Sequence, residues 1–555
     1  MQIKTKILLI NILFFSGLII LPNICSAQEI NMPSIFADHM VLQRGQKVPV
    51  WGKTDIAALV TVKFAGQQKS GIADSEGNWR IDLDAMTTSS ESRIMTISSK
   101  LNADGTEMKI SDVLVGEVWF AGGQSNMYRP FRMLTYPARE PIYEPIGAYL
   151  RNERDTAHDT LFRQFRVRSD FSVFEEKFQN RGNWTRLEGG DVNEFCATAY
   201  FFCRELRREL NVPVAMISCN LGATRVEPWI PMHAYQKNDT LEAFYKKEIA
   251  TFKERLEAWD EEKARAKHKQ ELADWEVKVE EAKSKNENEP RKPRLPEHPN
   301  RDKQIASTLY NAMIRPMIPY AIKGALWYQG ESNGNNHPEQ YALRMSAMIK
   351  GWREAWGQED LFFYYCQLAN YRSVNKEPLA ETDGWVMVQD QMRLAMNIPN
   401  AGMAVLNDIG EAKDIHPKNK IDAGKRLSLW ALNRVYGQDG LVVSGPIYKS
   451  SKIKGKKVEI TFDHVGSGLM VGKKNLLEPT FEVDEPLRRF QICGEDRQWK
   501  WAEAKIIAKD KVEVYHPEIP NPIEVRYAWS SNPEGANLYN KEGLPASLFK
   551  TLDRY

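Results

Sequence analysis

The chain has 555 residues, a net charge of +2, an apolar fraction of 42% and a charged fraction of 27%. This length exceeds the roughly 250–300 residues that one hydrophobic core organises, so two or three domains are expected. The near-neutral charge gives no basis for binding nucleic acid or an anionic membrane surface. The composition is that of an ordinary soluble globular protein.

The first 27 residues have the pattern of a secretory signal. Lys4 and Lys6 form a basic start, residues 7–21 are mostly apolar, and residues 25–27 are small residues that precede a predicted cut. The apolar run is shorter than the roughly 20 residues that span a bilayer comfortably, and an uncleaved anchor is the alternative. We therefore predict an extracytoplasmic protein, periplasmic or secreted, without membrane attachment after cleavage.

The cysteines do not indicate a disulfide framework or a metal site. Five remain after the predicted cut, an odd number without paired metal-ligand spacing. Buried free thiols are the expected state, and no metal or organic cofactor is predicted. The five are Cys196, Cys203, Cys219, Cys366 and Cys493.

In chain order, the predicted elements divide the protein into three domains. Short apolar or alternating runs between Gly, Asp and Ser turns predict a β-domain over residues 28–112. From 113 to 440, strand signals alternate with helix signals, such as a helix over 197–210 and a strand over 214–217. That alternation predicts an α/β domain with a parallel sheet covered by helices on both faces. Residues 441–555 return to a β pattern, so both flanking domains are expected to be β-sandwich-like.

A charged segment from about residue 240 to 305 interrupts the predicted α/β domain. It is dense in Glu, Lys and Ala, carries apolar residues at roughly helical spacing, and ends in a proline-rich stretch. We interpret it as a helical insertion, either a solvated hairpin resting on the core or a lid or partner-binding arm. The other elements expected in this domain are helices over 311–318, 341–356 and 423–436, and strands over 324–328 and 361–368.

The most informative motif is Gly-Gln-Ser-Asn-Met at residues 123–127, directly behind an apolar run that reads as a strand. Glycine lets the backbone turn sharply and approach other groups closely. Ser125 at such a turn can present its Oγ as a nucleophile and its own N–H as the first donor of an oxyanion hole. The plain alternative is a turn or helix cap.

Three later segments supply the partners that a serine esterase needs. Gly222 can expose a backbone N–H after the predicted strand 214–217, and Asn333 offers a neutral side-chain donor in Trp-Tyr-Gln-Gly-Glu-Ser-Asn. His416 lies before a predicted helix and titrates near neutral pH, so it can shuttle a proton. Asp414 is the nearest acid and can hold the imidazole in the required tautomer.

Together these stretches resemble the SGNH (GDSL-like) hydrolases, and most closely the sialate O-acetylesterase-like family of carbohydrate esterases. Ser125, Gly222, Asn333 and His416 fall in that family's block order. The resemblance implies an SGNH-hydrolase-like sheet and a serine esterase that removes O-acetyl groups from sialic acids through an acetyl-enzyme. An acetylesterase for plant polysaccharide such as xylan, and a non-catalytic carbohydrate-binding protein, are the alternatives. Similar stretches occur at residues 40–43, 50–52, 226–229, 526–529 and 537–546.

Two positions depart from the family pattern. Ala223 stands where relatives usually show another glycine, and Lys413 occupies the place, three before the histidine, where the acid commonly lies. Asp414 is therefore a hypothesis for the orienting acid. Asp408 and Glu411 are alternatives, as is a Ser–His dyad helped by a backbone carbonyl.

Four further residues of these motifs are candidates for binding an O-acetylated carbohydrate substrate. Gln124 precedes the serine, and Gln329 and Glu331 belong to the Asn333 segment. Arg225 lies beside Gly222 and can pair with a sialate carboxylate, while a structural arginine is the alternative. The sequence does not indicate the oligomeric state.

Overall fold

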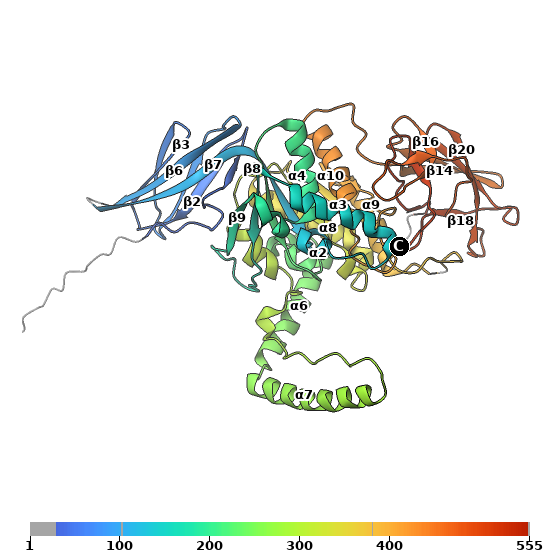
Figure 1. Cartoon of the computed structure of the whole chain (residues 1–555), viewed down its shortest axis with the longest axis horizontal. Coiled ribbons are helices and arrows are strands. Elements are labelled where there is room, and N and C mark those ends of the chain that lie inside the picture. Colours follow the sequence, from blue (N-terminus) through green and yellow to red (C-terminus); the bar gives the residue numbers. More distant parts are fainter. Residues whose placement is uncertain (1–28, 102–103, 380, 553–555) are drawn as a thin grey trace, which may run out of the picture.

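The computed structural model describes residues 29–101, 104–379 and 381–552, so the predicted signal at residues 1–27 lies outside the described chain. Figure 1 shows an N-terminal β-domain, a central α/β domain and a C-terminal β-domain arranged in a row. A helical arm projects from the central domain. No helix of the described chain is long and apolar enough to cross a membrane.

The central sheet confirms the predicted α/β fold class. Its strand order is β13-β12-β11-β7-β10-β8-β9, and every neighbouring pair is parallel except β8–β9. The inner strands are almost wholly buried because helices cover both faces. The strands are β7 (Asp104–Gly123), β8 (Asp159–Val167), β9 (Gly182–Leu187), β10 (Val214–Asn220), β11 (Gly324–Tyr328), β12 (Phe362–Cys366) and β13 (Ala401–Ala404).

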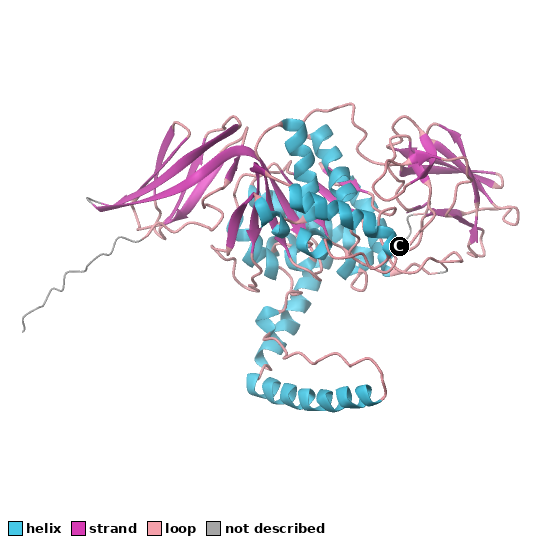
Figure 2. Cartoon of the chain, in the orientation of Figure 1, coloured by secondary structure: helices cyan, strands magenta, loops and turns pink. Residues whose placement is uncertain are grey.

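Two consecutive residues of β7 show how the helices are distributed over the sheet. Successive side chains of a strand point to opposite faces. Trp119 contacts Phe202 of α4, with 4.9 Å between ring centroids, whereas Phe120 contacts Trp352 of α8 at 5.2 Å. Helix α4 therefore covers one face, together with α10 packed against it, and α8 covers the other (Figure 2). The longer core helices are α3 (Glu144–Thr156), α4 (Ala197–Leu210), α8 (Tyr341–Trp356), α9 (Gly384–Leu394) and α10 (Lys420–Arg434).

Most predicted core elements match the structure, and one is corrected. The helices over 197–210 and 341–356 and the strand over 324–328 have the predicted bounds. The predicted helix over 311–318 is instead a π-helical turn followed by a 3-10 turn. Pro316 has no N–H to donate into an α-helical ladder, which is the physical reason for the tighter turn. Short helical turns occupy α1 (Ser125–Tyr128), α2 (Phe131–Leu134) and α5 (Met232–Tyr235).

Strand β7 belongs to two domains at once. Its first half pairs with β6 (Ser89–Leu101) and β1 (Val41–Gln43) of the N-terminal domain, and its second half pairs with β10 and β11 of the central sheet. The boundary expected at residue 112 thus falls inside a continuous strand. Buried Arg163 of β8 fastens this crossing, since its guanidinium lies 2.9 Å from the Asp112 carboxylate and donates to the carbonyl of His39.

The flanking domains are mainly antiparallel β-structures, and β1 of the N-terminal domain pairs in parallel with β7. The N-terminal domain contains β1 (Val41–Gln43), β2 (Val48–Lys53), β3 (Leu59–Phe64), β4 (Gln67–Ile72), β5 (Asn78–Leu83) and β6 (Ser89–Leu101). The C-terminal domain has a separate apolar core. Its strands are β14 (Ile447–Lys454), β15 (Lys457–Asp463), β16 (Leu469–Lys473), β17 (Phe481–Glu482), β18 (Phe490–Cys493), β19 (Lys500–Trp501), β20 (Glu503–Ala508), β21 (Lys511–Tyr515), β22 (Glu524–Tyr527), β23 (Leu538–Asn540) and β24 (Phe549–Lys550).

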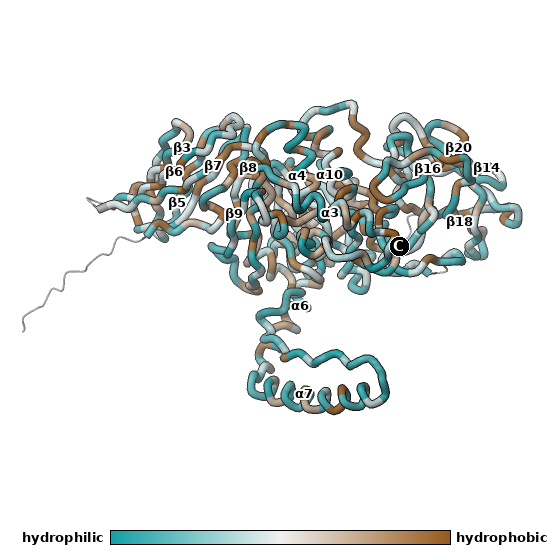
Figure 3. The backbone as a smooth tube through the Cα atoms, in the orientation of Figure 1, coloured by the Kyte–Doolittle hydropathy of each residue, from teal (hydrophilic) through white to brown (hydrophobic). Residues whose placement is uncertain are grey.

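The charged insertion forms the projecting arm. Helix α6 (Asp239–Glu257) is rooted in the central domain, where Phe252 packs in a small apolar cluster with Val173 and Ile305. Helix α7 (Glu261–Ser284) lies away from the core (Figure 1). The segment that returns from α7 to the core is mostly hydrophilic (Figure 3). In this structure the insertion is a solvated helical arm.

Helix α10 follows the loop that carries His416, so its seating on α4 should control both stability and activity. A Cβ on Gly424 would lie 2.6 Å from the Cβ of Phe201 and 2.7 Å from the carbonyl oxygen of Thr198. We expect Gly424→Ala to lower the free energy of unfolding by about 1–3 kcal/mol, because an added methyl overpacks this contact.

Urea unfolding of the mature protein checks this prediction. Gly440→Ala is the matched control, because a Cβ there meets no described atom within 4 Å. Equal unfolding midpoints for the two variants would contradict the proposed close packing of α10 on α4.

Candidate active site

Ser125 stands at the carboxyl end of the central strand β7. Gly123 has φ +137°, and a Cβ at this position would collide with the carbonyl oxygen of Tyr328 on β11. The N–H of Gln124 then donates to the same carbonyl at 3.0 Å. This close approach turns the chain into α1, with Ser125 as its first residue. In open α/β sheets, ligands bind at the strand ends where the strand order reverses, and β7 lies at that point.

The loop after β10 brings Gly222 against Ser125. A Cβ on Gly222 would lie 3.6 Å from the Cβ of Ser125. The loop is held from outside, because Lys303 donates to the carbonyl of Gly222 and Gln304 donates to that of Ala223, both at 2.7 Å. Ala223 adopts φ +55°, a conformation that favours glycine, which explains physically why glycine suits this position.

His416 lies in the loop before α10, where its imidazole faces a carboxylate and a guanidinium group. Its Nδ1 is 3.6 Å from Asp414 Oδ1 and 2.7 Å from Nη2 of Arg129. The backbone N–H of His416 also donates to Asp414 Oδ1 at 2.9 Å. Arg129, at the end of α1, was not anticipated from the sequence, where only its position four residues after Ser125 marks it.

The structure separates the three carboxylates considered for His416. Asp408 receives two hydrogen bonds from Arg426, at 2.6 and 2.8 Å. Glu411 accepts the backbone N–H of Lys418 at 2.6 Å. Asp414 is the one of these three that the structure brings to the imidazole of His416.

The charges around His416 set its protonation. Burial lowers the pKa of His416, the positive charges of Arg129 and Lys420 lower it further, and Asp414 opposes this. Burial acts to raise the pKa of Asp414, but its contacts with His416 and the charge of Arg139 outweigh burial and bring this pKa to about 2. At neutral pH the imidazole is therefore neutral beside an ionised carboxylate, which suits a general base.

The side chain of Asn126 joins the segments that carry Ser125 and His416. Its Nδ2 donates to Glu331 Oε1 at 2.5 Å and to the carbonyl of Ile415 at 3.0 Å. Its Oδ1 accepts from Lys420 Nζ at 2.5 Å. Because Asn126 follows the serine and Ile415 precedes the histidine, one amide holds both segments. Neither Asn126 nor Lys420 has a predicted role in the sequence motifs.

The ammonium group of Lys420 and the carboxyl group of Glu331 are buried against this amide. Burial lowers the pKa of Lys420 to about 8, with the Glu331 carboxylate opposing the shift. Burial likewise raises the pKa of Glu331, whose Oε2 has no hydrogen-bond partner in the described chain. Glu331, which is predicted to bind substrate, accepts a hydrogen bond from Asn126 next to the serine in this structure.

Asn333, the predicted oxyanion donor, and Gln329, a predicted substrate contact, are directed into the core. Both are 0% exposed. Asn333 Nδ2 donates to Glu227 Oε2 at 3.1 Å, and its Oδ1 accepts from Gln329 Nε2 at 2.8 Å. In this structure the amides of Asn333 and Gln329 are therefore engaged by protein groups. The buried ion pair of Glu227 with Arg344 draws these amides inward.

The guanidinium group of Arg225 is also paired with groups of the protein. Its guanidinium lies 2.7 Å from the Glu248 carboxylate of α6 and donates to the carbonyl of Gln304 at 2.8 Å. These contacts balance its charge and fasten the arm to the core, which matches the structural alternative expected for this arginine.

Gln124 is 3% exposed, and its Oε1 accepts from Gln329 Nε2 at 3.2 Å. Its Nε2 makes no hydrogen bond to any described residue.

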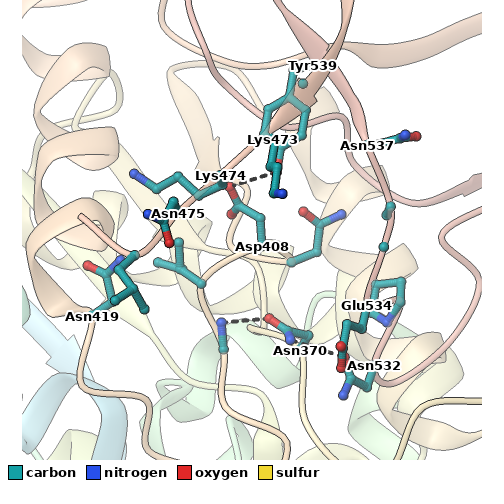
Figure 4. A pocket seen from close by; sticks show the side chains of 18 of the residues that line it. Asn370, Asp408, Asn419, Lys473, Lys474, Asn475, Asn532, Glu534, Asn537 and Tyr539 are labelled. Carbon is teal, nitrogen blue, oxygen red and sulfur yellow. Dashed lines mark hydrogen bonds between the residues drawn. The ribbon is translucent and has the colours of Figure 1, made fainter. Parts of the chain in front are cut away.

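A cavity whose lining includes neither Ser125 nor His416 lies between the central and C-terminal domains (Figure 4). It encloses about 380 Å³ and is lined mainly by polar side chains. Several of these already pair with protein groups: Asp408 with Arg426 and Tyr539, and Lys474 with Asp422 at 2.9 Å. Among the described residues that line it there is no predicted nucleophile or base, so it is not the candidate active site.

The described part of the chain holds no group of three or more His, Cys, Asp or Glu side chains placed to bind a metal ion. The five cysteines after the predicted signal are free and buried, as expected.

Comparisons with known proteins agree with this architecture. A family model described as "carbohydrate esterase, sialic acid-specific acetylesterase" matches residues 299–429. Sialate O-acetylesterase of Rattus norvegicus is 25% identical over 558 residues, covering 93% of each chain, and the Homo sapiens protein is 23% identical over 552 residues, covering 93% of this chain and 91% of its own. A crystal structure described as a novel carbohydrate acetylesterase from Xanthomonas citri superposes with a TM-score of 0.72 at 30% identity, covering 95% of this chain and 100% of that one.

The fold and these similarities define a carbohydrate esterase with an SGNH-type core. The chain belongs to the sialate O-acetylesterase-like family of carbohydrate esterases.

The contacts of Asn126 predict a positioning role. We expect Asn126→Ala to reduce kcat by about 10²-fold, because a small displacement of Ser125 relative to His416 is costly to the reaction. KM should change much less, since the variant leaves the groups that face the substrate in place. The measurement is steady-state kinetics combined with thermal unfolding.

Asn152→Ala, at an exposed position of α3, is the control for general effects of truncating an asparagine. An Asn126→Ala enzyme with unchanged kcat would remove this residue from the positioning of the site.

Proposed function

We propose that this protein is a serine esterase that removes O-acetyl groups from sialic acids. The observation that carries the proposal is the Asn126 side chain, which joins the Ser125 segment to the His416 loop while Gly222 lies against Ser125. An ionised Asp414 beside a neutral His416 adds the electrostatic setting of a general base.

In the proposed reaction, Ser125 Oγ attacks the acetyl carbonyl while His416 accepts the serine proton. The tetrahedral intermediate collapses, the carbon–oxygen bond to the sugar breaks, and His416 returns the proton to the departing sugar oxygen. Water then attacks the acetyl-enzyme with His416 as base, releasing acetate and restoring the serine. The N–H groups of Ser125 and Gly222 are the proposed oxyanion donors, with Gln124 Nε2 as a further donor.

The tautomer of His416 is part of this proposal. An arginine side chain only donates, so the contact from Arg129 requires Nδ1 of His416 to accept and leaves the proton on Nε2. Accepting a proton from Ser125 through Nε2 requires the other tautomer, with Nδ1–H donating to Asp414. We propose that the imidazole exchanges Arg129 for Asp414 as its Nδ1 partner when substrate binds.

The substrate proposal follows the relatives, which are described as sialate O-acetylesterases. Acetylated plant polysaccharide such as xylan is the second candidate, because the structural neighbour is described only as a carbohydrate acetylesterase. An extracytoplasmic location, proposed from the signal pattern at residues 1–27, fits either substrate.

Hydrolysis of p-nitrophenyl acetate by the mature protein and by Ser125→Ala tests the nucleophile. We expect turnover by the natural chain and its loss in the variant, because no acetyl-enzyme can form without Oγ. Equal turnover by both proteins would overturn the assignment. Acetylated sialic acid and acetylated xylan, assayed side by side with the active enzyme, then separate the two substrates.

The pH dependence of kcat/KM tests the base. The active form of His416 is neutral and its pKa is lowered from 6.5, so the acidic limb should lie below pH 6.5. Arg129→Gln removes a nearby positive charge, which raises the pKa and moves the limb to higher pH. Asp414→Asn removes a negative charge, which lowers the pKa, and should reduce kcat by up to about 10⁴-fold through the wrong tautomer.

Asp408→Asn serves as the control acid, since its carboxylate pairs with Arg426. A rate loss confined to Asp408→Asn, with Asp414→Asn near the natural rate, would assign the orienting role to Asp408 instead.

A further inference from the structure

A cavity of about 430 Å³ lies beside Gly222, and its wall carries two arginines. It opens at the carboxyl ends of β8 and β10, and neither Asn333 nor Arg225 belongs to its lining. None of the catalytic assignments above uses its residues apart from Gly222. The polar residues of its lining are Tyr128, Arg166, Arg168, Ser169, Asn183 and Asn220.

The strand ladder places this cavity at a defined distance from Ser125. Asn220 of β10 pairs with Gly123 of β7, and Ser218 of β10 pairs with Arg166 of β8. Adjacent strands lie about 4.8 Å apart, so the end of β8 is roughly 10 Å from the end of β7. That separation suits a ligand with its ester at Ser125 and another functional group at the opposite end of the same sugar.

Arg166 is a rigid part of the wall. It forms an ion pair with Glu194 and donates to the hydroxyl of Tyr128 at 3.0 Å. Glu194 is also 2.5 Å from Arg132, so one carboxylate is shared by two guanidinium groups. The three side chains together leave an excess of one positive charge beside the cavity.

Arg168 adds a charge that protein groups do not balance. It is exposed, its backbone N–H donates to the carbonyl of Arg181 at 2.7 Å, and its guanidinium has no ion pair or hydrogen bond within the described chain. A guanidinium presents parallel N–H groups that match the two oxygens of a carboxylate. An anchored backbone with an unengaged guanidinium at a cavity wall is therefore suited to a carboxylate ligand.

We propose that this cavity is a subsite for the carboxylate of an acidic O-acetylated sugar, with Arg168 as the ion-pairing residue and Arg166 as a fixed cationic wall. The inference rests on the proposed esterase function at Ser125 and adds the residues that select an acidic substrate. It replaces Arg225, whose charge is balanced by Glu248. A neutral acetylated xylan has no carboxylate and therefore forms no ion pair with Arg168 in this subsite.

The test compares an acidic with a small neutral substrate. For Arg168→Gln we expect KM for O-acetylated sialic acid to rise about tenfold, the loss of one charge-assisted contact. Its kcat/KM for p-nitrophenyl acetate should stay at the natural value, because that ester has no carboxylate. Arg181→Gln is the matched control: it makes the same charge change at an exposed neighbouring position outside the lining of the cavity, and both substrates should be unaffected.

Direct binding keeps this inference separate from the esterase proposal. Calorimetric titration with deacetylated sialic acid, a product that needs no catalysis, should show weaker binding to Arg168→Gln than to Arg181→Gln. An unchanged KM and unchanged product binding in Arg168→Gln, or equal losses in both arginine variants, would overturn the subsite. If the subsite inference alone is wrong, p-nitrophenyl acetate turnover still depends on Ser125. If the esterase proposal is wrong, that turnover persists in Ser125→Ala.

Discussion

The amide of Asn126 is the contact on which the arrangement of the candidate site depends. It binds the carbonyl before His416, the ammonium of Lys420 and the carboxylate of Glu331 from a single side chain. Burying a cation and an anion is unfavourable unless both are hydrogen-bonded, and the amide provides a donor to one and an acceptor to the other. Strand β7 and the start of α10 are therefore held together by a polar cluster whose disruption would leave charges without partners.

A second buried polar cluster is formed by Arg344, Glu227, Asn333 and Gln329. The ion pair of Arg344 with Glu227 is fully buried, and it binds Asn333, which in turn binds Gln329. Removing one partner of a buried ion pair leaves an uncompensated charge, so such networks define a single arrangement of the chain. Residues that follow β11 and look chemically active thus stabilise the loop from below, while the groups at the surface of the site come from the ends of β7, β10 and the His416 loop.

The central sheet is tied to the N-terminal β-domain, and the helical arm is attached to the core at its root. Strand β7 continues from the N-terminal β-domain into the core, and Arg163 fastens the crossing by its contacts with Asp112 and His39. The helical arm is attached through the root of α6 and through Arg225, while α7 is solvated. Burial and the positive charges of Arg129 and Lys420 lower the pKa of His416. Arg166 and Arg168 add positive charge to the wall of the neighbouring cavity.

The sequence by itself determined the features that depend on near neighbours along the chain. Helical periodicity defined α4 and α8, a short buried apolar run defined β11, and turn chemistry identified Gly123, Ser125 and Gly222. Only the tertiary structure decided the partners of side chains, because those lie far away along the chain: Lys420 reaches Asn126 across 294 positions. For the same reason it buried Asn333, paired Arg225 with Glu248 and brought Arg129 to His416. Asp414 and Asp408 both lie near His416 in the sequence, and the fold directs Asp414 to the imidazole and Asp408 to Arg426.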